Sequence, residues 1–84
     1  MYRVEFASRA QRMIRNLPAD IQRRLDPALQ ALSQDPRPPG CKQLSGEESV
    51  WRIRVGDYRI VYQIRDNELL VLVLKMGHRR EIYR

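Results

Sequence analysis

VWRIRVGDYRIVY, residues 50–62, is the stretch that decides the fold of this chain. Apolar and arginine side chains alternate along it, and the alternation resumes after Gly56-Asp57. The apolar positions are Trp51, Ile53, Val55, Tyr58, Ile60 and Tyr62, and the arginines are Arg52, Arg54 and Arg59. A period of two is typical of a strand with one buried face, and glycine opening a two-residue loop suits a type I′ or II′ turn. The stretch therefore predicts a β-hairpin with one apolar and one arginine face.

The predicted hairpin places two positive charges directly opposite each other. A two-residue loop pairs Val55 with Tyr58 and Arg54 with Arg59, and Arg52 follows two residues along the first strand. Like charges facing each other across two strands destabilise a sheet. The simplest explanation for such an arrangement is an anionic ligand or partner on that face, and a phosphate backbone is the obvious candidate.

The composition agrees with an anionic partner. The 84 residues suffice for one small domain over residues 1–84, with 16 Lys+Arg against 10 Asp+Glu and a net charge of +6. Such a basic balance favours nucleic acid, an acidic protein or an anionic membrane as partner. Fourteen of the sixteen basic residues are arginine. Because arginine matches phosphate oxygens bidentately and stacks on bases, we place nucleic acid ahead of a merely solubilising surface charge.

Several classes of site are excluded by the scarcity of the residues that would form them. One cysteine, Cys41, leaves no internal disulfide, and with a single histidine, His78, a zinc site is implausible. We expect no metal and no cofactor. The N-terminus lacks the apolar region of a signal peptide, and the longest apolar run, residues 69–74, is too short to cross a bilayer. We therefore expect a cytosolic protein.

The N-terminal half predicts a short strand followed by two helices. Residues 2–6 alternate weakly, as an opening strand does, and Ser8 is a candidate cap for the first helix. Pro18 suits the first position of the second helix. Pro27 lies inside that helix, where we expect a kink or a restart with Asp26 as cap. The apolar stripes are Ala10, Met13, Ile14 and Leu17 in the first helix and Ile21, Leu25, Ala28, Leu29 and Leu32 in the second.

The C-terminal half predicts strands. Residues 35–40, DPRPPG, begin one long connection that ends near residue 49. After the hairpin, Asp66-Asn67 reads as a second two-residue turn into a strand over residues 68–76, and residues 79–83 as a short final strand after a bend at Gly77. That turn predicts the pairs Arg65–Glu68, Ile64–Leu69, Tyr62–Val71 and Ile60–Val73.

Together these elements predict an α+β fold in which two antiparallel helices pack on one face of a small, mainly antiparallel twisted sheet, in the order β-α-α-β-β-β. We expect the helices to cover Ile53, Ile60, Tyr62, Ile64, Leu69, Val71 and Val73. The other face carries the arginines beside Val61, Leu70, Leu72 and Leu74. Because the last long strand is apolar on both faces, we expect its second face to be covered by the C-terminal tail or by another chain.

The whole pattern resembles the RelE/ParE superfamily of toxins from type II toxin-antitoxin systems. The resemblance spans the full chain, and its most specific parts are the VGDYRIVY hairpin and the ending GHRREIY, residues 77–83, which look more like the RelE branch. The resemblance implies an mRNA endonuclease that enters the A site of the 30S subunit and cuts mRNA by attack of a 2′-hydroxyl on the adjacent phosphate. It also implies a RelB-like antitoxin that neutralises the toxin in a hetero-oligomer.

The resemblance also implies roles for individual residues, carried over by position. Arg52 and Arg54 fall on a basic pair of the first hairpin strand and would position the substrate and neutralise its charge. Arg59 and Arg79 would clamp the transition state, where negative charge develops on the phosphate oxygens. Tyr83 falls on a terminal tyrosine that would stack on a base or exchange a proton.

The chain departs from the best-known RelE pattern in the hairpin pair, which is lysine there. Lysine is able to lose a proton beside other cations, whereas arginine is effectively always protonated, so Arg52 and Arg54 are unsuited to act as a general base. Tyr83 and His78 are the remaining candidate proton acceptors. Otherwise catalysis relies on electrostatics and on the ribosome holding the 2′-hydroxyl in line.

Two other functions remain open at this point. A ParE-like toxin would bind DNA gyrase, and its basic face would contact protein and cut nothing. A RelE-like fold without nuclease activity would bind its antitoxin and not stop growth. The helix arginines Arg12, Arg15, Arg23 and Arg24 are best explained as a solvated face, and Tyr58, Tyr62 and Trp51 as core residues.

Overall fold

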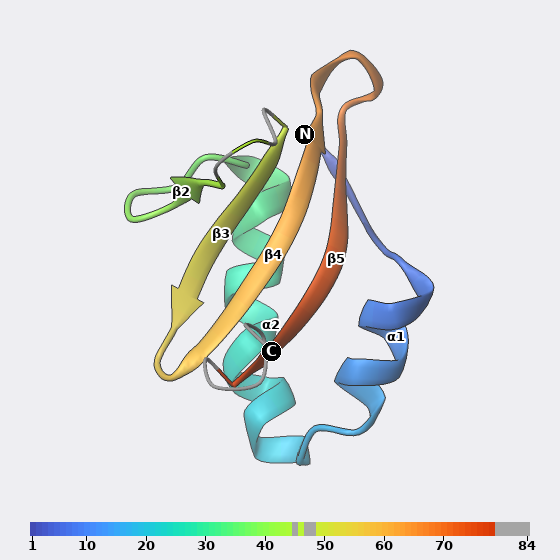
Figure 1. Ribbon diagram of the computed structural model, residues 1–84, viewed down its shortest axis with the longest axis vertical. Coiled ribbons are helices and arrows are strands. Elements are labelled where there is room, and N and C mark those ends of the chain that lie inside the picture. Colours follow the sequence, from blue (N-terminus) through green and yellow to red (C-terminus); the bar gives the residue numbers. More distant parts are fainter. Residues whose placement is uncertain (45, 47–48, 79–84) are drawn as a thin grey trace.

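Two helices and a five-stranded sheet make up the part of the chain that the computed structural model describes, residues 1–44, 46 and 49–78 (Figure 1). The helices are α1 (Ser8–Arg15) and α2 (Ala19–Gln34). The strands are β1 (Arg3–Phe6), β2 (Lys42–Gln43), β3 (Val50–Val55), β4 (Tyr58–Arg65) and β5 (Leu70–His78), with the 3₁₀ turn η1 (Asp66–Glu68) before β5. Within the described ranges, neither helix has the length and apolarity needed to span a membrane.

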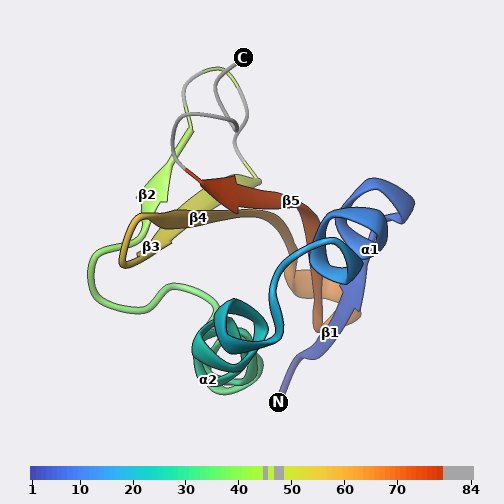
Figure 2. The ribbon, with the colours of Figure 1, turned by 90° about the horizontal axis from the view of Figure 1, so that it is seen from below.

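The sheet has the order β1-β5-β4-β3-β2, with β1 parallel to β5 and all other neighbours antiparallel. Both helices lie on the same side of it, with α2 beneath β3 and β4 and α1 beside β5 (Figure 2). The predicted α+β class is confirmed. The sequence analysis missed β2 because two exposed polar residues show no alternation that would mark a strand.

The β3–β4 hairpin has the predicted register. Val55 pairs with Tyr58 and Arg54 with Arg59 across the two-residue loop. Gly56 has a φ of 62°, whereas Asp57 is not among the residues with positive φ. Because a type I′ turn needs positive φ at both central positions, the loop fits type II′.

The predicted β4–β5 turn is wrong. Residues 66–68 form η1 and Leu69 adopts a left-handed conformation with φ 49°, so the strands are joined by four residues and not two. The register therefore moves by two, giving Ile64–Val71 and Tyr62–Val73. A shift of two keeps every side chain on its predicted face. Leu69 is the exception, because it lies in the turn and is 51% exposed instead of joining the core.

A β-bulge further along corrects a second set of pairs. Tyr62 pairs with Val73 but Val61 pairs with Lys75, so Leu74 is the extra residue, and Ile60 faces Met76 instead of Val73. Beyond it, β5 continues through Gly77 to His78, past the predicted end at residue 76. The predicted final strand over residues 79–83 lies outside the described residues.

The helices differ from prediction at their starts and at Pro27. Ser8 is the first residue of α1 and makes no side-chain capping bond, and Pro18 is the N-cap of α2 instead of its first helical residue. The helix α2 runs through Pro27 without a restart at Asp26. Packing explains this continuity, because the buried leucines of α2 lie on both sides of the proline along one stripe: Leu25, Leu29 and Leu32.

The main core lies between the helices and the sheet. Its buried members are Ala10, Leu25, Leu29, Leu32, Ile53, Ile60, Tyr62, Ile64, Val71, Val73 and Met76. All predicted sheet positions except Leu69 are among them. A smaller cluster on the opposite face joins Val50 and Val61 to the half-buried Leu44 and Leu74.

Two substitutions test which leucines belong to the core. Leu32→Ala should lower the free energy of unfolding by about 2–5 kcal/mol, because Leu32 is fully buried. Leu69→Gly should leave it unchanged or raise it by about 1 kcal/mol, because glycine accepts positive φ without strain. Urea unfolding measures both. A loss of several kcal/mol in Leu69→Gly would show that Leu69 is a core residue after all.

Candidate nucleic-acid interface

Three arginines share the sheet face that lies away from the helices. Arg52 and Arg54 alternate with core residues along β3, and Arg59 does so along β4. The register places Arg54 directly opposite Arg59, and Arg52 faces Val61 two pairs further along, on the same side of the sheet. We call Arg52, Arg54 and Arg59 the arginine face. The structure thus brings together the three hairpin arginines that the sequence singled out.

These three side chains differ in burial. Arg52 and Arg59 are each only 9% exposed, whereas Arg54 is exposed. Arginine is rarely so buried in a protein. Within the described ranges, Arg54 makes no hydrogen bond or ion pair, which leaves its guanidinium available to an incoming anion. Bidentate binding of a phosphate is the chemistry for which a guanidinium is best suited.

Of the other predicted site residues, only His78 is among the described residues, and it does not join this face. His78 faces Tyr58 across β4 and β5 on the helix side of the sheet, with the two rings 5.7 Å apart and almost perpendicular. It lines a cavity of about 430 Å³ together with Met13, Asn16, Leu17, Pro18, Tyr58, Met76 and Gly77. Arg79 and Tyr83 lie outside the described residues, so their roles remain predictions.

A second polar group, which the sequence analysis missed, ties the proline-rich connection to the sheet. Arg37 donates to both carboxylate oxygens of Asp66, at 3.4 and 3.0 Å, and the Tyr2 hydroxyl donates to Oδ1 of Asp66 at 2.6 Å. The guanidinium of Arg37 also lies over the Trp51 ring, 5.4 Å from its centre. We call Tyr2, Arg37 and Asp66 the Asp66 cluster.

The contacts of this cluster shift the proton affinity of its members. The hydrogen bond from Arg37, together with that from Tyr2, holds the pKa of Asp66 below its ordinary value of 3.8. Donation to the carboxylate of Asp66 raises the pKa of the Tyr2 phenol above 10.0. Next to the cluster, the buried Tyr62 hydroxyl donates to the Pro36 carbonyl at 2.8 Å, and burial raises the pKa of Tyr62.

No local sequence pattern predicts the Asp66 cluster. Its hydrogen bonds join residues 29 and 64 positions apart, and Asp66 reads simply as a turn residue. Among the residues with described positions, no group of three histidine, cysteine, aspartate or glutamate side chains gathers to hold a metal ion.

Comparison with known proteins gives consistent results. The family model described as "ParE toxin of type II toxin-antitoxin system, parDE" matches residues 2–83. Toxin RelG of Mycobacterium tuberculosis is 34% identical over 87 residues, which cover 99% of this chain and 97% of that protein.

Solved structures agree with the sequence matches. The isolated E. coli RelE toxin superposes with a TM-score of 0.84 at 30% identity, covering 99% of this chain and 92% of that one. The toxin in the RelBE2 toxin-antitoxin complex of Mycobacterium tuberculosis gives a TM-score of 0.81 at 31% identity, covering 93% and 98%.

The Asp66 cluster predicts a two-sided pH dependence. The pKa of Asp66 is lowered on folding, so this carboxylate stabilises the folded state above pH 3.8. That contribution is lost as the pH falls through the lowered pKa. The pKa of Tyr2 is raised on folding, so this phenol stabilises the folded state below pH 10.0. That contribution is lost as the pH rises through the raised pKa. The stability difference between wild type and Asp66→Asn should therefore be largest near neutrality and shrink at both extremes.

Urea unfolding from about pH 2 to pH 12 measures this difference, because the losses are expected below 3.8 and above 10.0. Glu68→Gln is the matched control, since Glu68 is an exposed neighbour whose ion pair with Arg65 spans 3.7 Å. That substitution should have little effect at any pH. A difference between wild type and Asp66→Asn that stays constant across the range would contradict the account of the cluster.

Proposed function

The chain belongs to the RelE/ParE superfamily of toxins from type II toxin-antitoxin systems, and on this premise we propose that it is a ribosome-dependent mRNA endonuclease of the RelE type. The observation that carries the proposal is the arginine face. Two guanidinium-bearing side chains stand directly opposite each other, and a third lies two residues along the same strand. Three cations held on one side of a rigid sheet suit a nucleic-acid strand as ligand.

The proposed reaction is an internal transesterification. The 2′-hydroxyl of one mRNA nucleotide attacks the adjacent phosphorus in the ribosomal A site, forming the O2′–P bond while the P–O5′ bond breaks. The proton of the 2′-hydroxyl leaves during the attack, and the departing 5′-oxygen takes up a proton. Negative charge develops on the non-bridging oxygens and the leaving oxygen, where preorganised guanidiniums stabilise it.

We assign roles to the residues accordingly. Arg59, whose burial fixes its position, and Arg79, assigned by sequence position alone, clamp the transition state. Arg52 and Arg54 position the message. Because His78 lies on the helix side of the sheet, the proposal leaves Tyr83 as the group of this chain that exchanges a proton. The remaining rate enhancement comes from in-line positioning of the 2′-hydroxyl on the ribosome.

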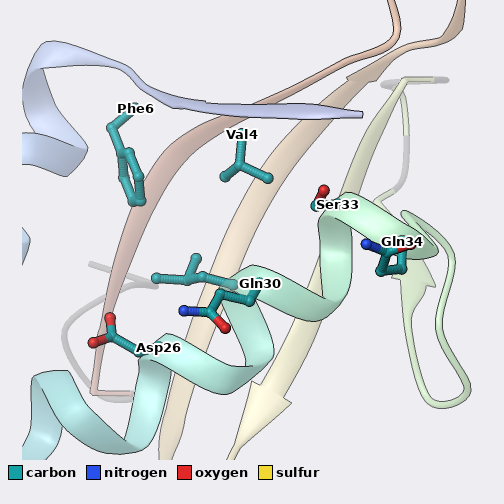
Figure 3. A pocket seen from close by; sticks show the side chains of 7 residues that line it. Val4, Phe6, Asp26, Gln30, Ser33 and Gln34 are labelled. Carbon is teal, nitrogen blue, oxygen red and sulfur yellow. The ribbon is translucent and has the colours of Figure 1, made fainter. Parts of the chain in front are cut away.

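We further propose that a RelB-like antitoxin neutralises the toxin, as the RelBE complexes among the similar structures suggest. Strand β1 ends the sheet, so a segment of the partner is able to add to its open edge. Beside that edge, a groove of about 430 Å³ lies between β1 and α2 (Figure 3). Val4 and Phe6 project into it from β1 toward α2 (Figure 3), which offers an apolar floor for the partner's side chains.

A gyrase-binding toxin is the second candidate, because the matching family model is described by the ParE toxin. In that case the arginine face contacts protein and the chain cuts no RNA. Primer-extension mapping of mRNA from cells that express the chain separates the two functions. Cleavage within translated codons supports the nuclease, whereas intact mRNA with induced DNA damage supports the gyrase inhibitor.

Substitution of the two clamps tests the site assignment. Arg59→Ala and Arg79→Ala should each lower cleavage of a defined message on purified ribosomes by at least about 100-fold, because each removes a donor to the developing charge. Arg65→Ala is the matched control, since Arg65 is exposed at the far end of β4 and pairs with Glu68.

Arg65→Ala should cleave at the wild-type rate, and circular dichroism should show that all three variants are folded. Wild-type cleavage by folded Arg59→Ala and Arg79→Ala would overturn the assignment of these clamps.

A further inference from the structure

The outer edge of β3 is open beyond Arg52. Strand β2 pairs with β3 at two positions only, Lys42 with Arg52 and Gln43 with Trp51. Gly40, the residue that would face Arg54 if the pairing continued, lies outside β2 in the proline-rich connection. In the described part of the chain, no strand therefore covers β3 at Ile53, Arg54 and Val55.

In an antiparallel sheet, the backbone groups of successive residues point alternately to the two neighbouring strands. This alternation shows which backbone groups of β3 point to its open edge. The amide of Ile64 donates to the Ser49 carbonyl at 2.8 Å, and the amide of Leu44 donates to the Val50 carbonyl at 2.9 Å. Odd-numbered residues of β3 therefore direct their backbone groups toward β4, and even-numbered residues direct theirs outward. The N–H and C=O of Arg54 point outward, and no residue with a described position bonds to either.

A cavity lies at this edge. It has a volume of about 350 Å³ and is lined by Ala28, Ala31, Pro38, Pro39, Gly40, Ile53 and Arg54. The volume falls in the range of small-molecule sites, and the walls are small apolar side chains and flat proline rings. Such walls suit a planar ring system better than a flexible chain.

The proline wall of the cavity is fixed by contacts already described. Tyr62 holds the Pro36 carbonyl, and Arg37 is bound by Asp66 and stacked on Trp51. Both anchors lie within three residues of Pro38 along the chain. The cavity is therefore preformed, which reduces the cost of ordering it when a ligand binds.

We propose that this cavity is a subsite for the base of one RNA nucleotide. The base enters between α2 and the proline wall, where the Arg54 N–H donates to it and the Arg54 C=O accepts from it. Every RNA base offers a donor and an acceptor on one edge. The phosphate of the same nucleotide lies on the Arg54 guanidinium, so Arg54 holds both parts of the nucleotide at the rim of the sheet.

This inference rests on the proposed function, since it places part of the message on this chain. It gives the toxin a direct contact with one base and hence a source of sequence preference. Phosphate contacts alone position a strand without reading it, whereas contacts to a base edge discriminate between bases.

Nuclear magnetic resonance on the ¹⁵N-labelled full chain tests the subsite without requiring cleavage. The probes are the four nucleoside 5′-monophosphates, and ribose 5-phosphate is the control that has the anion and sugar but no base. The nucleotides should shift the amide signals of Arg54 and Gly40, with different affinities for different bases. Ribose 5-phosphate has only the phosphate contact with the Arg54 guanidinium, so it should leave the Gly40 amide signal in place and shift that of Arg54 less than the nucleotides do.

A pair of matched substitutions in α2 locates the bound base. Ala31→Leu fills the cavity from an exposed position on its wall and keeps a strong helix former, so the fold should persist. It should weaken nucleotide binding by at least about tenfold. Ala19→Leu makes the same change at an exposed position in the first turn of α2, away from the cavity, and should bind as wild type does.

Equal shifts with ribose 5-phosphate would overturn the subsite, and so would unchanged nucleotide binding by Ala31→Leu. Cleavage on ribosomes by a wild-type chain that shows no base-dependent shift would overturn the subsite alone. Base-dependent shifts at Arg54 in a chain that cleaves no message would overturn the proposed function and support the cavity as a nucleotide site.

Discussion

The register of the β3–β4 hairpin is the constraint on which the rest of the structure depends. Gly56 supplies the positive φ that a two-residue loop requires, and that loop fixes which residues face each other. The same register sends Ile53, Ile60 and Tyr62 toward the helices and the arginines to the other side. Because a slip of one residue would exchange the two faces, the core and the candidate interface are set by one turn.

The proline-rich connection is the second determinant, and it acts through contacts distant in sequence. Without a partner it would be a loosely held loop, but Arg37 and Tyr62 bind it to the β4–β5 turn and to the core. It then forms one wall of the cavity at the open edge of β3. The Asp66 cluster contains none of the three arginines of the arginine face, yet it holds the segment that leads into β2.

Regular features of the sequence were predictable, and irregular ones were not. Alternation gave the hairpin, its arginine pair and the two-layer α+β arrangement. The turn at residues 66–69 was mispredicted because Asp66-Asn67 is an equally good two-residue turn by composition, and nothing local favours the left-handed conformation of a leucine. The bulge at Leu74 likewise has no signal in the sequence, because an inserted residue leaves the apolar run of β5 unchanged.

The site was predictable to the same extent. Arg52, Arg54 and Arg59 follow from period-two alternation, so the structure brings them together as expected. His78 was placed by sequence alone near a catalytic ending, and its partner Tyr58 became evident once the β4–β5 register was known. The Asp66 cluster and the β3 edge cavity depend on tertiary contacts between segments 12 or more residues apart, which no window of sequence reveals.

The central claim is that the paired arginines oppose folding and are present for an anionic ligand. The most direct test is the free energy of unfolding of Arg54→Gln against wild type, measured by urea at low and at high salt. Removal of one charge should raise stability at low ionic strength by about 0.2–1 kcal/mol, and the gain should fade near 1 M salt as the repulsion is screened. An Arg54→Gln variant that is less stable than wild type at low salt would contradict the claim, because the pair would then contribute to the fold.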